Sequence, residues 1–459
     1  MYIKICLVYL TIPVLHALLI QPRRMVYSRL FSIVEEKVNE NLPPSRPVRG
    51  ILSLFFDDTY SFLHSKRLEE YQVQNKEESG CMFRTFLLGK PAVVVTDPNA
   101  MTEMFTQEYD QSMVTVVPPH HRGIEAEHAQ FCSWMKPSLS SSKVSTHETT
   151  MELTIDNWLH EMSRQNVKSY VQAVPLVRAL FLGLNLQIFL GTLSMDDSLM
   201  NLIETWAQSS VAHPFAIFPW RKSAKAKKAR QQIFHQLVQI AKQDKGMKPV
   251  TLIGKLMRKM EQNQQTLKVE DVIDWMLTTI FVGADATASA AISMWKVLSL
   301  EPDVKENLQM HPDGIPTFVT NILQTYPPAP FGIRQVKKEM QVGDYTIPSD
   351  WFVVYGLAVA LQDHGPEDWL RLDSNDAPWA FGGGPQRCPG RFLASQQLIS
   401  FGRMLVHMNW QLKVRQNLKQ EYNPGLFPVG GFFVRFPNKI PSRIRKYFST
   451  DSFLSQLGN

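Results

Sequence analysis

A cysteine, Cys388, follows a run of glycines and stands just before a segment with helical periodicity. The run reads Phe381-Gly-Gly-Gly-Pro-Gln-Arg-Cys-Pro-Gly390, and residues 391–405 carry apolar side chains at helix-compatible spacing. Glycine has no Cβ, so the backbone can approach the sulfur closely and surround it with N–H donors. A thiolate ligand needs such a setting. The loop therefore predicts a metal-ligating thiolate followed by a helix; the alternative is a free cysteine in a glycine-rich turn.

The pattern Phe-Gly-x-Gly-x-x-x-Cys-x-Gly resembles the cysteine-ligand loop of the cytochrome P450 family, with every fixed position filled. The resemblance implies a mainly α-helical, single-domain fold with small β-sheets that binds heme b. Cys388 would be the axial ligand of the heme iron. Phe381, Gly382 and Gly390 would shape the loop around the thiolate, and Arg387 would reach a heme propionate.

Residues 272–300 predict a long apolar helix with a carboxylate, Asp285, near its centre. It resembles the family's distal helix, in which an acid and a hydroxyl relay protons during oxygen activation. Asp285 and Thr287 match two of its positions and are the candidate catalytic residues. Ala286 replaces the usual relay threonine, which weakens this mechanism unless Thr287 or a water supplies the hydroxyl at a helix distorted near Gly283. The alternative is that Asp285 only caps or solvates a local kink.

A second departure concerns the ion network that braces the heme core in this family. The family has Glu-x-x-Arg on a helix before a Tyr-Pro-Pro step, and a further arginine before the cysteine. Counting back from Tyr326 places Asn321 and Gln324 at the pair, and Asp368 stands where the arginine belongs. Losing one member would strand a buried charge, whereas losing all three permits a neutral hydrogen-bonded replacement. The sequence thus indicates a coordinated change.

Two further positions resemble family contacts with heme propionates. Arg334, in Phe331-Gly-Ile-Arg, matches one of them. His128 matches the first residue of a helical Trp/His-x-x-x-Arg motif, with Cys132 in the arginine's place. The alternative is that His128 is an ordinary surface histidine.

The N-terminus is largely apolar from Ile5 to Ile20, and Arg23-Arg24 follows. This pattern predicts a membrane anchor over residues 1–24, with a cleaved signal peptide as the alternative. The two arginines would hold the following chain on the cytosolic side, so we expect an endoplasmic reticulum membrane protein. Residues 25–50 form a linker with a proline-rich hinge, and residues 51–459 are expected to form one catalytic domain.

Small sheets are expected on both sides of the helical region. Two largely apolar runs, residues 81–89 and 91–96, predict a hairpin joined at Gly89-Lys90, and Asp97-Pro98 predicts a helix after it. Residues 342–354 predict a strand, a turn and a second strand. The four cysteines form no C-x-x-C pair, which is typical of reduced, cytosol-facing thiols.

The net charge of +6 is mild, and the basic residues form no aromatic-interleaved strip, so nucleic acid is not an expected partner. A basic run between Trp220 and Arg230 predicts a solvated helix face or a contact with membrane lipid. The resemblance implies oxygen transfer from O₂ to a small apolar substrate, isoprenoid or lipid-like, with electrons from an NADPH-dependent reductase. One alternative is a heme-thiolate isomerase or dehydratase that acts on a peroxide or epoxide without a reductase. The other is a non-catalytic, membrane-tethered heme-binding relative.

Overall fold

The computed structural model describes residues 82–87, 90–107, 113–115, 125–165, 169–191, 251–262, 269–329, 331–357, 379–422 and 425–437, and single residues between 228 and 239. The predicted anchor and hinge, Asp368, and the basic run apart from Lys228 and Ala229 lie outside the described residues. The chain forms two compact units. The first takes in Met1–Val117, Pro330–Leu361 and Gly382–Arg387, and the second takes in Pro118–Ala329, Gln362–Phe381 and Cys388–Asn459. The expectation of one catalytic domain over residues 51–459 stays a prediction.

A five-stranded sheet organises the first unit. In spatial order its strands are β1 (Met82–Leu87), β2 (Lys90–Val95), β8 (Phe352–Tyr355), β5 (Gly332–Val336) and β3 (Met113–Thr115). The β1–β2 pair is antiparallel, which confirms the predicted hairpin, and β2 runs parallel to β8. Alternate residues of these strands point to one face. Ala92, Val94, Phe352 and Val354 therefore form one buried cluster.

The helix predicted after the hairpin is α6 (Pro98–Gln107), whose first turn is capped by Asp97: its Oδ1 accepts from the N–H of Ala100 at 2.8 Å. The prediction for residues 342–354 is confirmed: a strand, β7 (Tyr345–Ile347), is followed by a turn and by β8. A further strand, β6 (Met340–Val342), precedes β7 across a turn at Gly343 (φ 57°). Pro348 follows β7, and Asp350 adopts a positive φ, so the chain turns again before β8.

The second unit is mainly helical. Its α-helices are α7 (Glu125–Met135), α8 (Ser141–Val144), α9 (Glu148–Gln165), α10 (Ala173–Leu190), α13 (Leu252–Gln262), α14 (Val269–Leu300), α15 (Pro302–Met310), α16 (Ile315–Thr325) and α18 (Arg391–Leu405). Short 3₁₀ turns are η3 (Lys136–Leu139), η4 (Ser145–His147), η5 (Pro312–Gly314) and η7 (Trp379–Phe381).

Two small antiparallel sheets complete this unit. One contains β4 (Val171–Gln172), β12 (Phe433–Arg435) and β9 (Gln411–Leu412), and the other is the hairpin of β10 (Gln420–Tyr422) and β11 (Leu426–Pro428). The structure therefore has the expected mainly helical fold with small sheets. The helices predicted over residues 272–300 and 391–405 are confirmed as α14 and α18.

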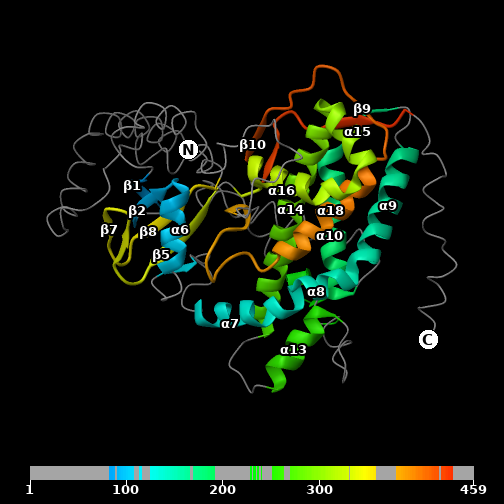
Figure 1. Cartoon of the computed structure of the whole chain (residues 1–459). Coiled ribbons are helices and arrows are strands. Elements are labelled where there is room, and N and C mark those ends of the chain that lie inside the picture. The colour runs from blue at the N-terminus through cyan, green and yellow to red at the C-terminus, as the bar shows by residue number, and fades with distance from the viewer. Residues whose placement is uncertain are drawn as a thin grey trace, which may run out of the picture. The chain divides into compact units, whose positions relative to one another are not determined.

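The core of the second unit lies around α14, which packs against α10 and α18, while α18 packs against α9 (Figure 1). Buried Trp295 of α14 has its ring 5.7–6.3 Å from those of Phe401, Trp410, Phe432 and Phe436. By length and composition α10 and α14 could each cross a membrane, but most of each is buried inside the protein. A helix that is apolar nearly all round is buried in a core or in a membrane, so we assign both to the core.

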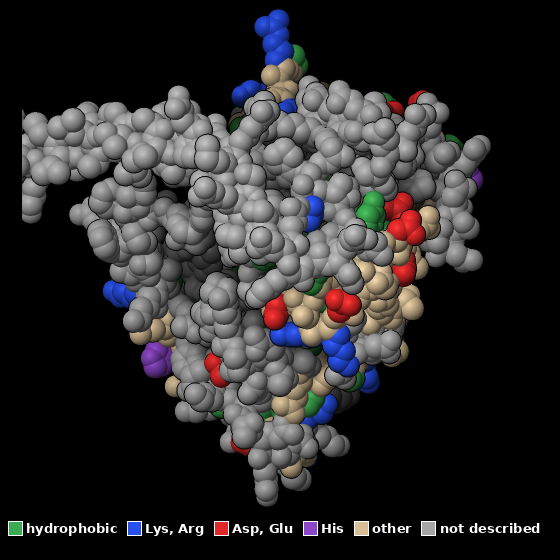
Figure 2. All heavy atoms as spheres, turned by 90° about the vertical axis from the view of Figure 1, so that its left-hand side faces the viewer, with side chains coloured by type: hydrophobic (Ala, Val, Ile, Leu, Met, Phe, Trp, Pro, Cys, Tyr) green, Lys and Arg blue, Asp and Glu red, His purple; other side chains and the backbone are tan. Residues whose placement is uncertain are grey.

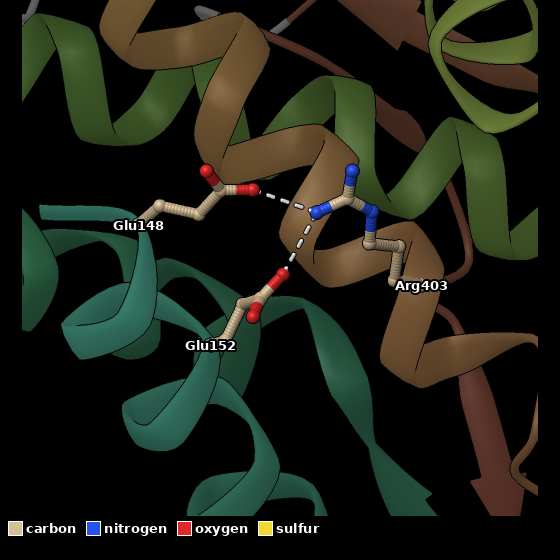
Figure 3. Close-up of polar contacts among 3 residues, drawn as sticks. All are labelled: Glu148, Glu152 and Arg403. Atoms are coloured by element: carbon tan, nitrogen blue, oxygen red, sulfur yellow. Dashed lines mark hydrogen bonds and ion pairs between the residues drawn. The ribbon is translucent and has the colours of Figure 1, made fainter. Parts of the chain in front are cut away.

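An ion cluster also joins α9 to α18. Nη1 of Arg403 lies 2.7 Å from a carboxylate oxygen of Glu148 and 2.9 Å from one of Glu152 (Figure 3). The two glutamates are four residues apart, so they occupy the same face of α9. Elsewhere on the surface, described acidic and basic side chains lie next to one another (Figure 2).

Candidate functional site

The loop before α18 is shaped by its backbone. After η7 the chain passes through two left-handed residues, Gly382 (φ 69°) and Gly384 (φ 66°). This region is unfavourable for residues with a Cβ, which explains the glycines. The N–H of Cys388 then donates to the carbonyl of Phe381 at 3.0 Å and closes the loop. Cys388 is thereby fixed at the start of α18.

Cys388 is half-buried and forms no disulfide within the described residues. Two residues separate it from the first residue of α18, and the partial positive charge of a helix N-terminus favours a thiolate. Nη1 of Arg391 donates to the Cys388 carbonyl at 3.3 Å, which fixes the backbone there. A Cβ built on Gly390 would lie 3.8 Å from Sγ, in ordinary contact, so Gly390 lies beside the sulfur. A soft, anion-ready ligand in this position fits the iron of a heme.

The first unit contains two arginines suited to an anionic group. Arg334 on β5 is 4% exposed, and its guanidinium lies 5.1 Å from the centre of the Tyr355 ring. The same tyrosine borders the glycine loop, because a Cβ on Gly382 would come within 3.3 Å of its hydroxyl. Nε of Arg387, on that loop, is also buried. A buried arginine and a half-buried one, both near one loop, fit heme propionates.

His128 lies on α7, and its side chain is outside what the structure describes. Cys132 follows one helical turn later and is half-buried. Burial raises the pKa of the Cys132 thiol; Lys136 lowers it, and charge on Cys388 raises it. Cys132 therefore lies close enough to Cys388, the candidate iron ligand, for the charge of Cys388 to affect the pKa of Cys132.

The middle of α14 is open along one stripe. Val282 is 57% exposed in a helix that is otherwise mostly buried, and Thr278, Thr279 and Ala286 beside it are half-buried. Spacings of three and four residues place these positions on one face. An exposed aliphatic side chain in this setting fits a helix face that receives an apolar group. Ala286, where the family has its relay threonine, is on this stripe.

Asp285 follows Val282 by three residues on α14, but its side chain is buried. Its Oδ1 lies 2.6 Å from Nε of Arg178 on α10, and its side chain is 8% exposed. The backbone N–H of Gly425, just before β11, also donates to it. Burial raises the pKa of the Asp285 carboxyl, while Arg178 and the Gly425 N–H lower it. Asp285 is therefore a buried carboxylate with an arginine partner.

Thr287 is also buried, on another side of α14. Its hydroxyl donates to the carbonyl of Gly283, one turn earlier, at 2.7 Å. Residues two apart do not face each other on a helix, so Asp285 and Thr287 are not brought together. The helix α14 is continuous from Val269 to Leu300, so it has no break at Gly283, and the distortion considered there stays a prediction.

The helix expected before the Tyr-Pro-Pro step is α16, which ends with Tyr326 as its C-cap. Asn321 and Gln324 lie on α16 and are half-buried. Their proposed neutral hydrogen-bonded replacement of the Glu-x-x-Arg pair stays a prediction.

Sequence reasoning missed Arg178 and Val282. Arg178 is the charged residue of an otherwise uncharged α10, and a lone charge in an apolar helix signals an opposite partner. Hydrophobic periodicity places Val282 on α14, but it does not tell which apolar face stays uncovered.

Comparisons with known proteins agree with this geometry. The sequence profile of the family "Cytochrome P450" matches residues 43–313. Cytochrome P450 120 of Synechocystis is 22% identical over 422 residues, covering 82% of this chain and 94% of its own. Beta-amyrin 16-beta-monooxygenase of Platycodon grandiflorus is also 22% identical, covering 83% of this chain and 90% of its own.

Solved structures share the fold. A cyanobacterial cytochrome P450 with retinoic acid bound superposes with a TM-score of 0.70 at 19% identity, covering 86% of this chain and 99% of its own. The family's enzymes bind heme b through an axial cysteine thiolate, and the described residues fit that group. The profile match, the cysteine loop and the fold together establish that this chain belongs to the cytochrome P450 family of heme-thiolate monooxygenases.

Proposed function

We propose that this protein is a reductase-dependent monooxygenase of apolar isoprenoid or lipid-like substrates, with Cys388 as the heme ligand. The half-buried thiol of Cys388, held on its glycine loop, carries the proposal. When bound, the heme supplies O₂ activation and the transfer of one oxygen atom. The loop residues Phe381, Gly382 and Gly390 hold the thiolate in place and limit its contact with water.

The propionates would be bound by Arg334 and Arg387, with His128 as a further donor. The burial of Arg334 supports this role, because a buried guanidinium is stabilised by an anion. Asp285 and Thr287 are the proposed proton-delivery residues. Thr287 can accept a hydrogen bond on its hydroxyl oxygen while donating to Gly283. Asp285 would exchange protons with water near the stripe of Val282 and Ala286.

The substrate class is supported by the open aliphatic stripe, which offers apolar contact. One relative is named as a beta-amyrin monooxygenase, and one of the similar solved structures has retinoic acid bound. Retinoic acid and beta-amyrin are therefore the first compounds to test with heme-loaded protein, an NADPH-dependent reductase and O₂. We expect a product one oxygen atom heavier, formed only with the reductase. Product formed from a hydroperoxide alone, with no NADPH consumption, would reject this function.

A second candidate is a heme-thiolate isomerase or dehydratase of peroxides or epoxides. It is favoured by Ala286, since the open stripe has no hydroxyl where the family has its relay threonine. Turnover of a lipid hydroperoxide without reductase separates the two functions.

We further propose an endoplasmic reticulum protein anchored by residues 1–24, with contact to membrane lipid. The apolar run and Arg23-Arg24 support this. Full-length protein should stay with the membrane after carbonate extraction. Mature protein that begins after residue 24 and is found in the secretory lumen would contradict it.

A further inference from the structure

Three elements that are distant in the sequence meet at Asp285. Arg178 comes from α10, Asp285 from α14, and Gly425 and Phe427 from the end of the β10–β11 hairpin. Arg178 makes two contacts at once: Nε lies 2.6 Å from the Asp285 carboxylate, and the guanidinium carbon lies 4.2 Å from the centre of the Phe427 ring. We call Arg178, Asp285, Gly425 and Phe427 the clamp.

The hairpin is also attached to α14 without the clamp. Ser289 Oγ donates to the carbonyl of Leu426 at 2.9 Å and accepts from its N–H at 3.0 Å. Gln420 donates to Ser293 at 2.8 Å and accepts from Nζ of Lys296 at 3.0 Å. These bonds hold the hairpin in place by themselves. Removing Arg178 should therefore perturb Asp285 more than the fold.

Glycine is required at the closest point of the clamp. A Cβ on Gly425 would lie 2.9 Å from Cε2 of Phe427 and 3.2 Å from Oδ2 of Asp285. Such approaches force the ring or the carboxylate to move. The backbone of the hairpin thus comes close enough to donate directly to Asp285.

We infer that Arg178 is a positioning residue for Asp285: it favours the charged form of this carboxylate and holds it against the hairpin. The Nε atom of Arg178 forms an ion pair with the carboxylate while its guanidinium lies over the Phe427 ring. The inference rests on the proposed function in so far as Asp285 delivers protons in the reaction. It adds a residue on α10 that influences the charge and orientation of the Asp285 carboxyl, the group proposed to deliver protons.

Within the described residues, Arg178 is the charged side chain that acts on Asp285. From α10 it faces Arg178, and neither β11 nor α16 contains a charged side chain. On α14 itself, Lys296 is engaged by Gln420. On the other elements packed against α14, Arg403 of α18 binds Glu148 and Glu152, and Lys305 of α15 donates to the carbonyl of Met408.

The sign of the pH effect follows from these contacts. The folded-state pKa of Asp285 is raised by burial, so the carboxyl favours folding at low pH, and this contribution is lost as pH rises through the folded pKa. Arg178 opposes this increase in the pKa of Asp285. Replacing it should raise the pKa of Asp285 further and enlarge the loss of stability at neutral and alkaline pH.

The first test is a double-mutant cycle on the thermal stability of the heme-loaded full chain. Its members are wild type, Arg178→Met, Asp285→Asn and the double variant, at about pH 5 and about pH 8. Arg178→Met should lower Tm at least about 2 °C more at the higher pH, and this difference should vanish in the Asp285→Asn background. An equal loss at both pH values, or a difference that persists in the Asp285→Asn background, would overturn the inference.

The second test measures the pH profile of the reaction, which should not change if Arg178 has only a structural role. The pH profile of reductase-driven NADPH consumption should shift to higher pH in Arg178→Met and stay near wild type in Arg178→Lys. A profile unchanged in Arg178→Met but altered in Asp285→Asn would overturn the inference. If Asp285→Asn leaves both the profile and product formation unchanged while the stability cycle still shows coupling, the clamp stands and the proton role of Asp285 fails.

Gly425→Ala provides a check that removes no charge. It should disturb Asp285 through the added Cβ and reproduce the direction of the Arg178→Met pH effect in a smaller degree. A Gly425→Ala protein that loses the same Tm at both pH values would count against the three-element clamp.

Discussion

The loop before α18 and the middle of α14 are held by different kinds of contact. The loop is fixed by its own backbone: two left-handed glycines and the bond from the Cys388 N–H to the Phe381 carbonyl. The middle of α14 is fixed by side chains from other elements, among them Arg178 and Asn185 of α10. The loop should therefore be sensitive to an added Cβ, whereas α14 should be sensitive to the loss of one partner.

The largest effect is expected from replacing Cys388, the thiolate ligand that the loop holds. Cys388→Ser replaces a strong thiolate ligand by a weak one, so the reduced carbon-monoxide spectrum should lose its thiolate-type band. Cys132→Ser is the matched control, since it removes the other half-buried cysteine described in the same unit. A thiolate-type spectrum that survives in the Cys388 variant, or one lost in the Cys132 variant alone, would reverse the assignment.

The side-chain contacts of α14 are broken by Asn185→Leu. Nδ2 of Asn185 donates to the carbonyl of Ile280, and its Oδ1 accepts from Gln397 of α18, each at 3.0 Å. All three groups are buried, and Asn185→Leu leaves the Ile280 carbonyl and the Gln397 amide without this partner. The variant should therefore lose about 1–3 kcal/mol of unfolding free energy, measured by chemical denaturation. The double change Asn185→Leu and Gln397→Leu should recover part of this loss. Strictly additive losses would show that the two amides do not act together.

The backbone contacts of the loop are tested by Gly382→Ala. A left-handed residue with a Cβ should cost about 1–2 kcal/mol, and the new Cβ would also crowd the Tyr355 hydroxyl. Gly343→Ala is the matched control, because Gly343 has a similar φ but open space around it. We expect both variants to lose stability in denaturant titrations and only the Gly382 variant to release heme faster. Equal heme release would indicate that the loop does not depend on this conformation.

The smallest effect is expected on α16, where the two altered positions are half-buried. Asn321→Glu and Gln324→Arg should each lower heme occupancy, because each adds a partly desolvated charge. The double variant should regain part of the occupancy through a restored pair, measured as heme per protein after gel filtration. Independent losses would mean that the two side chains do not face each other.

The same contrast explains how far the sequence could predict this protein. The hairpin of β1 and β2, the helices α14 and α18, and the position of Cys388 follow from local patterns of glycine, proline and apolar spacing. The partner of Asp285 does not, since an ion pair between two helices has no local signal beyond a lone charge in each. Nor could spacing reveal that Thr287 would turn its hydroxyl back to Gly283 in an unbroken helix.

The bare stripe of Val282 and Ala286 has a consequence for selectivity. These two side chains offer no hydrogen bond, so this part of the stripe recognises a molecule by its outline, and one methylene more or less then changes preference by about 10–200-fold. Under the proposed function, chemically related lipids would compete with one another for this enzyme. Its preference among them would depend on their relative abundance in the membrane, and a single bulkier residue at Val282 could change which of them is oxidised.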